Sequence, residues 1–304
     1  MDFKKLRYFL VLAEELHFAR AAERLFIAQP PLSRQIQQLE KELGVSLFVR
    51  TKRTVRLTPA GEFLRREATG LFEQINALEE RVRLVGQGTL GPVKIGYVGA
   101  VMHSLLPSLL TELGREYPGI FTMLEEMPNQ AQVEALRAGR IDLGFVRSPV
   151  TDDQLVAIPI LTETFSLVVA ASHPLAAARG LALRDFAGEP FICFSRECAP
   201  AMVDTIFNIC RAAGFEPRKT HETSQINTIL RLVESNLGYS LVPSGVSDGY
   251  RLNLRFVELS DIPERAEVSL LYNPAIATAA ARNIVALFGR LAERGQAGRR
   301  KREG

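Results

Sequence analysis

The stretch FIAQPPLSRQIQQLEKELG, residues 26–44, carries side chains that could form hydrogen bonds with the edges of nucleic-acid bases. Its apolar residues follow the spacing of one helix face: Leu32, Ile36, Leu39 and Leu43. The opposite face presents Ser33, Arg34, Gln37, Gln38 and Lys41. Arginine can donate two hydrogen bonds to guanine, and glutamine can pair with adenine. The chemistry indicated is the reading of bases by a helix.

The first turn of this predicted helix favours the same interpretation. Proline is tolerated there because the first N–H groups of a helix have no partner within it. The positive end of the helix attracts phosphate, and proline rings can touch thymine methyl groups. We predict a recognition helix that enters the DNA major groove end-on, with contacts from Gln29, Pro30, Pro31, Ser33, Arg34 and Gln37. The alternative is an amphipathic helix whose polar face is only solvated.

The segment that follows, LFVRTKRTVRLT (47–58), makes this alternative less attractive. It alternates apolar and polar residues as a β-hairpin does, and it holds four basic residues and no acidic one. A basic wing beside a recognition helix would contact phosphates or reach a minor groove. We expect Arg50, Lys52 and Arg53 to make these contacts.

Two further helices must position this apparatus. Apolar spacing predicts a helix over 3–14 and another over 18–25, where alanines allow close approach of a neighbouring helix. Residues 1–58 hold eleven basic and six acidic side chains, whereas the centre of the chain is net acidic. A basic head of this kind indicates a polyanionic partner. The prediction is a winged helix-turn-helix DNA-binding domain over residues 1–58.

Residues 59–88 have the pattern of a long linker helix. Thr58 can cap its start, with Pro59 at the first position. Apolar residues then recur with heptad spacing, which predicts pairing with the same helix of a second subunit. The dimerisation residues expected are Leu64, Leu71, Ile75, Leu78 and Val82. The alternative is burial of this face against the body of its own chain.

The head and the start of the linker resemble the winged helix-turn-helix of LysR-type transcriptional regulators. The stretch is FARAAERLFIAQPPLSRQIQQLEKELGVSLFVRTKRTVRLTPAGEFL. The matching residues are Ala21-Ala22, Gln29-Pro30, Ser33, Ile36, Leu39-Glu40, Leu43-Gly44, Leu47-Phe48, Arg50 and Leu57-Thr58-Pro59-Ala60-Gly61. In the body, EALRAGRIDLGFVR (134–147) and GYSLVP (238–243) resemble further family segments. Ala28 departs from the pattern, because many relatives have serine or threonine there, and the alanine lacks the hydroxyl that could cap the helix and contact a phosphate.

The resemblance implies partners that the residues alone do not. It implies double-stranded promoter DNA as an inverted repeat, a small organic effector, and an output through RNA polymerase. It also implies a homotetramer built as a dimer of dimers. Among the family, the chain is most similar to regulators of aromatic-compound degradation.

The body, residues 91–299, alternates strand and helix signals. Strands are expected at 93–98, 142–147, 165–171, 191–195 and 239–243, and helices near 101–116, 131–138, 200–213 and 225–236. This order predicts an α/β domain with a parallel or mixed sheet and helices on both faces. The resemblance refines it to two Rossmann-like lobes, as in periplasmic solute-binding proteins. Lobe I would be 91–161 with 267–295, and lobe II 162–266, which makes the whole chain an α/β multi-domain protein with a coiled-coil linker helix.

Ligands in such sheets bind at the carboxyl ends of strands and at helix N-termini. That places an effector site between the lobes, with residues that follow strands or open helices: Gly99, Ala100, Val101, Arg147, Phe194, Ser195, Ile226 and Asn227. The resemblance adds Asn129 and Met202 to this site. At Ala100 and Asn129 benzoate- and muconate-type regulators have hydroxyl residues, and at Met202 an aromatic residue is frequent.

Arg147 carries the chemical prediction for this site. An arginine at the end of an apolar strand needs an anionic partner, and its planar fork suits a carboxylate. The effector expected is a small carboxylate, aromatic or dicarboxylic, and the resemblance favours an arginine at this position. The alternative is an ion pair within the protein.

Two rival functions deserve comparison. Cys198 and Cys210 flank a helix, as redox-sensing members of the family have two cysteines in this region, but Cys210 shares an apolar helix face with Ile206 and is expected in the core. A binding protein or enzyme built on the two-lobed body is the other rival. His17, His103, His173 and His221 are scattered without ligand spacing, and no phosphate-binding loop occurs. We expect no enzyme activity, no cofactor and no metal.

Composition and the distribution of apolar residues indicate whether the chain is folded, secreted or inserted in a membrane. With 47% hydrophobic and 23% charged residues, the chain has the material for packed domains rather than for disorder. Glu14, Glu15 and His17 interrupt the apolar run near the N-terminus, which argues against a secretion signal. No apolar run is long enough for a bilayer, so the expectation is a cytoplasmic protein without a membrane partner. The basic end RRKREG (299–304) is expected to be a solvated tail.

Overall fold

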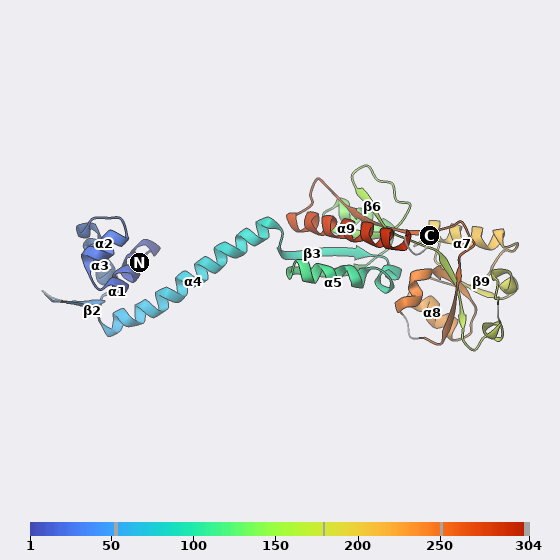
Figure 1. Ribbon diagram of the computed structural model, residues 1–304, viewed down its shortest axis with the longest axis horizontal. Coiled ribbons are helices and arrows are strands. Elements are labelled where there is room, and N and C mark those ends of the chain that lie inside the picture. Colours follow the sequence, from blue (N-terminus) through green and yellow to red (C-terminus); the bar gives the residue numbers. More distant parts are fainter. Residues whose placement is uncertain (52–53, 179, 250–251, 301–304) are drawn as a thin grey trace. The chain divides into compact units, whose positions relative to one another are not determined.

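The computed structural model describes residues 1–51, 54–178, 180–249 and 252–300. The chain divides into two compact units, Met1–Arg83 and Leu84–Gly304. Figure 1 traces both units along the sequence. Within the described residues, no helix is both long enough and apolar enough to cross a membrane.

The first unit is the winged helix-turn-helix that the sequence predicts. Its elements are α1 (Phe3–Glu15), α2 (Phe18–Arg24), α3 (Gln29–Leu43), β1 (Phe48–Arg50) and β2 (Val55–Leu57). Strands β1 and β2 pair antiparallel, with Phe48 opposite Leu57. The helices enclose a core around Phe9, Leu32 and Ile36, which are fully buried. The expected apolar face of α3 is therefore the face that packs, although Leu43 at its end stays 37% exposed.

The long helix α4 (Pro59–Gln87) begins where the sequence predicts. The Thr58 hydroxyl accepts a hydrogen bond from the Gly61 amide at 2.9 Å and donates to the Ser46 carbonyl at 2.8 Å. The same threonine therefore caps the helix and ties it to the turn before β1. A side chain at position 61 would meet the Leu47 carbonyl oxygen at 2.2 Å, so this approach requires glycine.

The second unit contains a five-stranded sheet in the order β4-β3-β5-β12-β6. Its strands are β3 (Leu90–Tyr97), β4 (Gly119–Glu126), β5 (Leu143–Arg147), β6 (Val156–Glu163) and β12 (Ala266–Tyr272). Strands β3, β4 and β5 are parallel, and β12 pairs antiparallel with β5 and β6. The sheet is therefore mixed, one of the two forms predicted.

Helices cover both faces of this sheet. Helices α5 (Leu106–Glu116) and α9 (Ala279–Arg300) pack on the face that carries Val93, Ile95 and Phe145. Helix α6 (Asn129–Arg137) packs on the opposite face, against Val146 and Leu271. One helix expected over 101–116 is in fact a 3₁₀ turn, η1 (Gly99–His103), followed by α5, because Pro107 suits the first turn of a new helix.

Two smaller sheets are formed by the part of the chain between β6 and β12. The chain crosses from the five-stranded sheet to these sheets after β6 and returns at β12. Strands β7 (Phe165–Ala170), β10 (Ser240–Pro243) and β11 (Leu254–Leu259) form one group, in which β7 is central. Strands β8 (Pro190–Phe194) and β9 (Arg218–Thr223) form the other, joined to it by a bridge between Phe191 and Tyr239. The short turns are η2 (Pro174–Ala177), η3 (Leu183–Phe186) and η4 (Ser244–Gly249). Strand β6 continues to Glu163, so the first crossing lies at Thr164 rather than at Leu161-Thr162.

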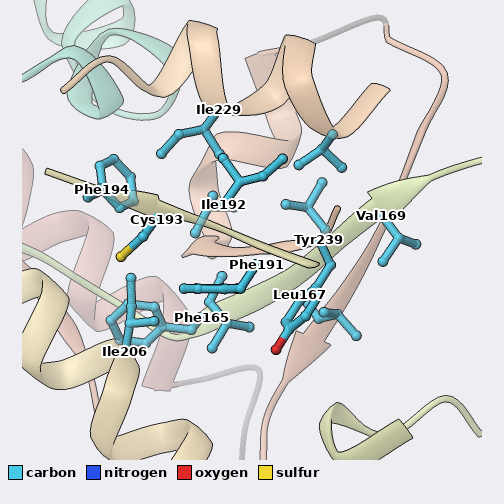
Figure 2. Packing of buried hydrophobic residues seen from close by; sticks show 14 of the residues in the cluster. Phe165, Leu167, Val169, Phe191, Ile192, Cys193, Phe194, Ile206, Ile229 and Tyr239 are labelled. Atoms are coloured by element: carbon cyan, nitrogen blue, oxygen red, sulfur yellow. The ribbon is translucent and has the colours of Figure 1, made fainter. Parts of the chain in front are cut away.

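Helices α7 (Pro200–Ala212) and α8 (Ile226–Glu234) complete this lobe. Figure 2 shows side chains of β7, β8 and α7 that meet in its core, among them Phe165 and Leu167 of β7, Phe191 of β8 and Ile206 of α7. All four of these side chains are fully buried. This core fixes the positions of β7 and β8. The first residue of β7, Phe165, and the last residue of β8, Phe194, line the cavity described below.

Candidate DNA-binding surface and effector cleft

Helix α3 presents its polar face to solvent. Gln29, Pro30, Pro31, Arg34 and Gln37 are exposed, and Ser33 is half-buried. No acidic side chain in the described part of the chain pairs with Arg34. The helix has no side-chain cap, because Ala28 offers no acceptor, and among its first three residues only Gln29 carries a backbone N–H, since Pro30 and Pro31 have none. The structure thus brings together the whole set of α3 residues predicted to contact DNA.

The wing, β1 and β2, is anchored to α3 by hydrogen bonds to Glu40 that the sequence pattern did not predict. The Glu40 carboxylate accepts hydrogen bonds from the amides of Leu47 and Phe48, at 2.9 and 3.1 Å. Its other oxygen accepts from the Arg50 guanidinium at 2.7 Å, and that guanidinium also lies 5.1 Å from the centre of the Phe18 ring. Arg50 therefore anchors the wing on α3 and α2, and its contact with phosphate stays a prediction. Lys52 and Arg53 lie outside the described residues.

The apolar seam of α4 divides into two parts. Leu64 packs against the core of the first unit, and Ala68 is 3% exposed. Beyond them the seam is open: Leu71 is exposed, Ile75 is half-buried, and Leu78 and Val82 are 60% and 63% exposed. Leu64 is therefore used within the first unit rather than against the body, and the outer residues keep an apolar stripe in solvent.

A cavity of about 710 Å³ opens in the second unit between the ends of its two sheets. It is lined by seven of the ten residues predicted for the effector site: Gly99, Ala100, Asn129, Arg147, Phe194, Met202 and Ile226. The other three do not line it. Val101 is fully buried in the core beside α5, the Ser195 amide donates to the Thr223 carbonyl in the extension of β8, and Asn227 lies on the first turn of α8.

Arg147 lines this cavity, and one nitrogen of its guanidinium forms an ion pair with Glu163. One nitrogen, Nη1, donates to Glu163 Oε1 at 2.9 Å, and both side chains are largely buried, with 11% and 4% exposed. The second Glu163 oxygen accepts from the Gly245 amide at 2.8 Å. The other guanidinium nitrogen, Nη2, is buried and has no hydrogen-bond partner in the described structure. Both interpretations of Arg147 thus find support, because one nitrogen is in an internal ion pair and the other lacks an acceptor.

Asn129 fixes the backbone of this arginine. Its amide nitrogen donates to the Arg147 carbonyl at 2.6 Å, and its oxygen accepts from the Arg147 amide at 3.0 Å. Both polar atoms of the Asn129 side chain therefore have protein partners, so its contribution to the site is to position Arg147. Its alignment with a hydroxyl residue of other regulators did not reveal this.

Sequence reasoning missed several charged residues of the cavity. Glu126 and Glu197 line it, and Arg137 forms an ion pair with Asp152. Arg265 also lines it and donates to backbone carbonyls of Ile262 and Glu264. These residues come from loops and strand ends far apart in the sequence, and charge alone did not distinguish them from surface residues. Glu163 follows an apolar strand as Arg147 does, which is the one signal that could have found it.

Comparison with known protein families agrees with both halves of this description. The family described as bacterial regulatory helix-turn-helix protein, lysR family, matches residues 3–62, and the LysR substrate binding domain matches residues 86–292. The transcriptional regulator AlsR of Bacillus subtilis is 33% identical over 272 residues, which cover 90% of each protein. BenM of Acinetobacter baylyi is 35% identical over 263 residues, which cover 86% of each.

The chain belongs to the LysR family of transcriptional regulators. Solved structures of LysR regulators have the same fold along their full length. The crystal structure of CbnR superimposes with a TM-score of 0.81 at 28% identity, covering 95% of this chain and 100% of CbnR. Full-length BenM gives a TM-score of 0.59 at 31% identity, covering 97% and 98%. Like them, the chain is a DNA-binding transcriptional regulator with an effector-binding domain.

The cysteines of this LysR regulator are placed as core residues in two of three cases. Desolvation by burial raises the pKa of Cys193 to about 11 and that of Cys210 to about 12. The thiolate is the reactive form, so both are poor nucleophiles at neutral pH. Cys198 is half-buried and lines the cavity. The prediction that Cys210 belongs to the core is confirmed.

Proposed function

We propose that this regulator reads promoter DNA with the exposed face of α3 and changes its action when a small carboxylate binds in the cavity. The observation that carries the effector class is the guanidinium of Arg147, which lines the cavity and whose Nη2 is buried and has no acceptor among the described residues. A carboxylate oxygen would satisfy that donor. An aromatic or dicarboxylic acid fits the available volume, since pockets of roughly 300–1,000 Å³ hold small organic ligands.

The surroundings of Arg147 support an anionic group at the same place. Helices α6, α7 and α8 each begin at the cavity, where Asn129, Pro200 and Ile226 line it. The N-terminus of a helix carries a partial positive charge. Phe194 and Met202 offer apolar surface for the rest of the ligand. Glu126 and Glu197 disfavour a polyanion, which limits the effector to one or two carboxylates.

A DNase footprint on the DNA upstream of the regulator's own gene tests this function. The expected result is protection over about two or more helical turns, each of about 10 base pairs, because a dimer presents two recognition helices. Benzoate and succinate would be compared with benzamide and succinamide, which have similar shapes without the charge. The acids should alter the protected pattern and the amides should not. A pattern altered equally by the amides would contradict the carboxylate assignment.

The exposed stripe of α4 supports assembly through this helix. Leu71, Ile75, Leu78, Val82 and Val85 recur at heptad spacing. A row of apolar side chains in water indicates a partner surface, and we propose the α4 helix of a second copy. Two such dimers would form the tetramer, and the DNA-bound assembly would act on transcription through contact with RNA polymerase.

A double charge substitution in this stripe provides a direct measure of the interface. With Leu78→Glu and Val82→Glu, we expect dimer affinity to fall by about 100-fold or more, because each association buries four fewer apolar side chains and adds like charges. Analytical ultracentrifugation would show the smaller species. Arg83→Glu, which changes an exposed residue on the face of the helix away from the stripe, is the matched control and should leave the mass unchanged. An unchanged mass in the double variant would place the interface elsewhere.

A further inference from the structure

Phe26 lies in the turn between α2 and α3, and it combines two features that folding does not explain. Its side chain is 96% exposed, the largest fraction among the large apolar side chains that the structure describes. Its neighbours Leu25 and Ile27 pack against the core of the first unit, so the chain has apolar anchors on either side. Its backbone has a φ of +54°, a left-handed conformation that bulky residues rarely adopt.

The hydrogen bonds of this turn identify the position. The Phe26 amide donates to the Glu23 carbonyl, and the Ile27 amide donates to the Ala22 carbonyl, both at 3.0 Å. This pair of bonds defines a Schellman motif, in which the left-handed residue after the helix is usually glycine. Phe26 occupies that residue at the end of α2.

The same chain shows what this position ordinarily holds. Five other helix ends in the described parts have the same pair of backbone hydrogen bonds and a positive φ. Their left-handed residues are Gly44, Gly88, Gly139, Gly214 and Asn236. Glycine has no Cβ penalty there, and asparagine is the next best residue. Phenylalanine at position 26 is thus unfavourable both for the backbone and for solvation.

We propose that Phe26 is a DNA-contact residue, packing its ring against apolar surface at the rim of the major groove. This inference rests on the proposed role of α3. In helix-turn-helix docking the first helix crosses the DNA backbone and the N-terminus of the second enters the groove. The turn that joins them must then lie between the backbone and the base edges. Deoxyribose and thymine methyl groups are the apolar surfaces there, and phenylalanine is suited to the thymine methyl.

The exposed residues next along the chain make the contact surface continuous. Phe26 precedes Gln29, Pro30 and Pro31 by three to five positions, and these are exposed as well. Arg34, one turn further along α3, adds a positive charge that forms no ion pair within the described part of the chain. An apolar ring beside exposed donors and a cation suits DNA better than an apolar protein surface.

The test compares Phe26→Gly with Leu16→Gly in the full-length protein. Leu16 ends α1 in the same left-handed conformation, with a φ of +48°, and is 42% exposed, so it is a matched control. Thermal unfolding and operator affinity over a range of salt concentrations are measured for each. Phe26→Gly should unfold at no lower temperature, yet bind the operator about tenfold more weakly, since a buried phenylalanine ring is lost from the complex.

Salt dependence distinguishes this contact from a phosphate contact. The slope of log affinity against log salt should stay unchanged in Phe26→Gly, because no charge is removed. Leu16→Gly should retain affinity within about twofold. The Phe26→Asn variant controls for effects that are specific to glycine, because asparagine also adopts the left-handed backbone conformation readily. Wild-type affinity in both position-26 variants would overturn the proposal, whereas absence of binding by the wild type itself would overturn the role of α3 instead.

Discussion

Arg34→Ala is expected to lose operator protection at concentrations where the wild type protects fully. A bidentate arginine contact contributes about 1–3 kcal/mol of discrimination for one base, so affinity should fall about 10- to 100-fold for each half-site. The structure supports this size of effect because Arg34 is exposed on α3 and pairs with no acidic side chain of the described residues. The substitution therefore removes an intermolecular contact without breaking an internal one. Competition footprints on operator and random DNA measure the change.

Two variants separate base reading from general attraction to DNA. Arg34→Lys keeps the charge but loses the planar fork, so it should retain the salt dependence and lose preference for the operator. Lys41→Ala removes a charge two turns further along the same helix and should weaken binding to all sequences alike. If Arg34→Ala weakened binding to operator and random DNA equally, Arg34 would be a phosphate contact and not a reader of sequence.

Arg50 shows why the recognition helix was predictable and the function of the wing was not. The α3 pattern is local, because a helix fixes which side chains share a face, and that face was identified from spacing alone. Whether a basic residue is free depends on its neighbours in space. The partner of Arg50 is Glu40, ten residues earlier, whose carboxylate also holds the amides of Leu47 and Phe48. No pattern in residues 47–58 predicts the hydrogen bond between Arg50 and Glu40.

The same distinction between local sequence patterns and neighbours in space applies to the effector cleft. Short apolar strands located the ends of β3, β5 and β8, and the rule that ligands bind at strand ends and helix starts placed five residues on the cavity, while the family resemblance added Asn129 and Met202. The strands that the sequence did not single out are edge strands or have polar residues, such as β9 with its sequence RKTHET. Val101 was assigned to the cavity because it follows a strand, but the 3₁₀ turn η1 points it into the core.

Arg147→Ala is expected to abolish the response to carboxylates and to destabilise the second unit. Removing one partner of a buried ion pair leaves an uncompensated charge, which costs about 3–5 kcal/mol. Glu163 would be that charge, with its side chain 4% exposed and with the Gly245 amide as its remaining partner. Denaturant unfolding measures the stability, and footprints with benzoate measure the response. The single variant alone cannot tell loss of a ligand contact from loss of a folded cleft.

A double variant, Arg147→Met with Glu163→Gln, resolves that ambiguity. Both buried charges disappear, methionine fills the volume of the arginine stem, and glutamine can still accept from the Gly245 amide. Replacing a whole buried pair in this way is often neutral, so unfolding stability should return to within about 1 kcal/mol of the wild type. The response to benzoate should remain absent, because the Arg147 Nη2 donor is gone. Arg265→Met removes a cavity arginine that, among the described residues, bonds only to backbone carbonyls, and it should keep both stability and response. A stable double variant that still responds to benzoate would show that Arg147 only holds the lobes together, and that the carboxylate binds to the helix N-termini without it.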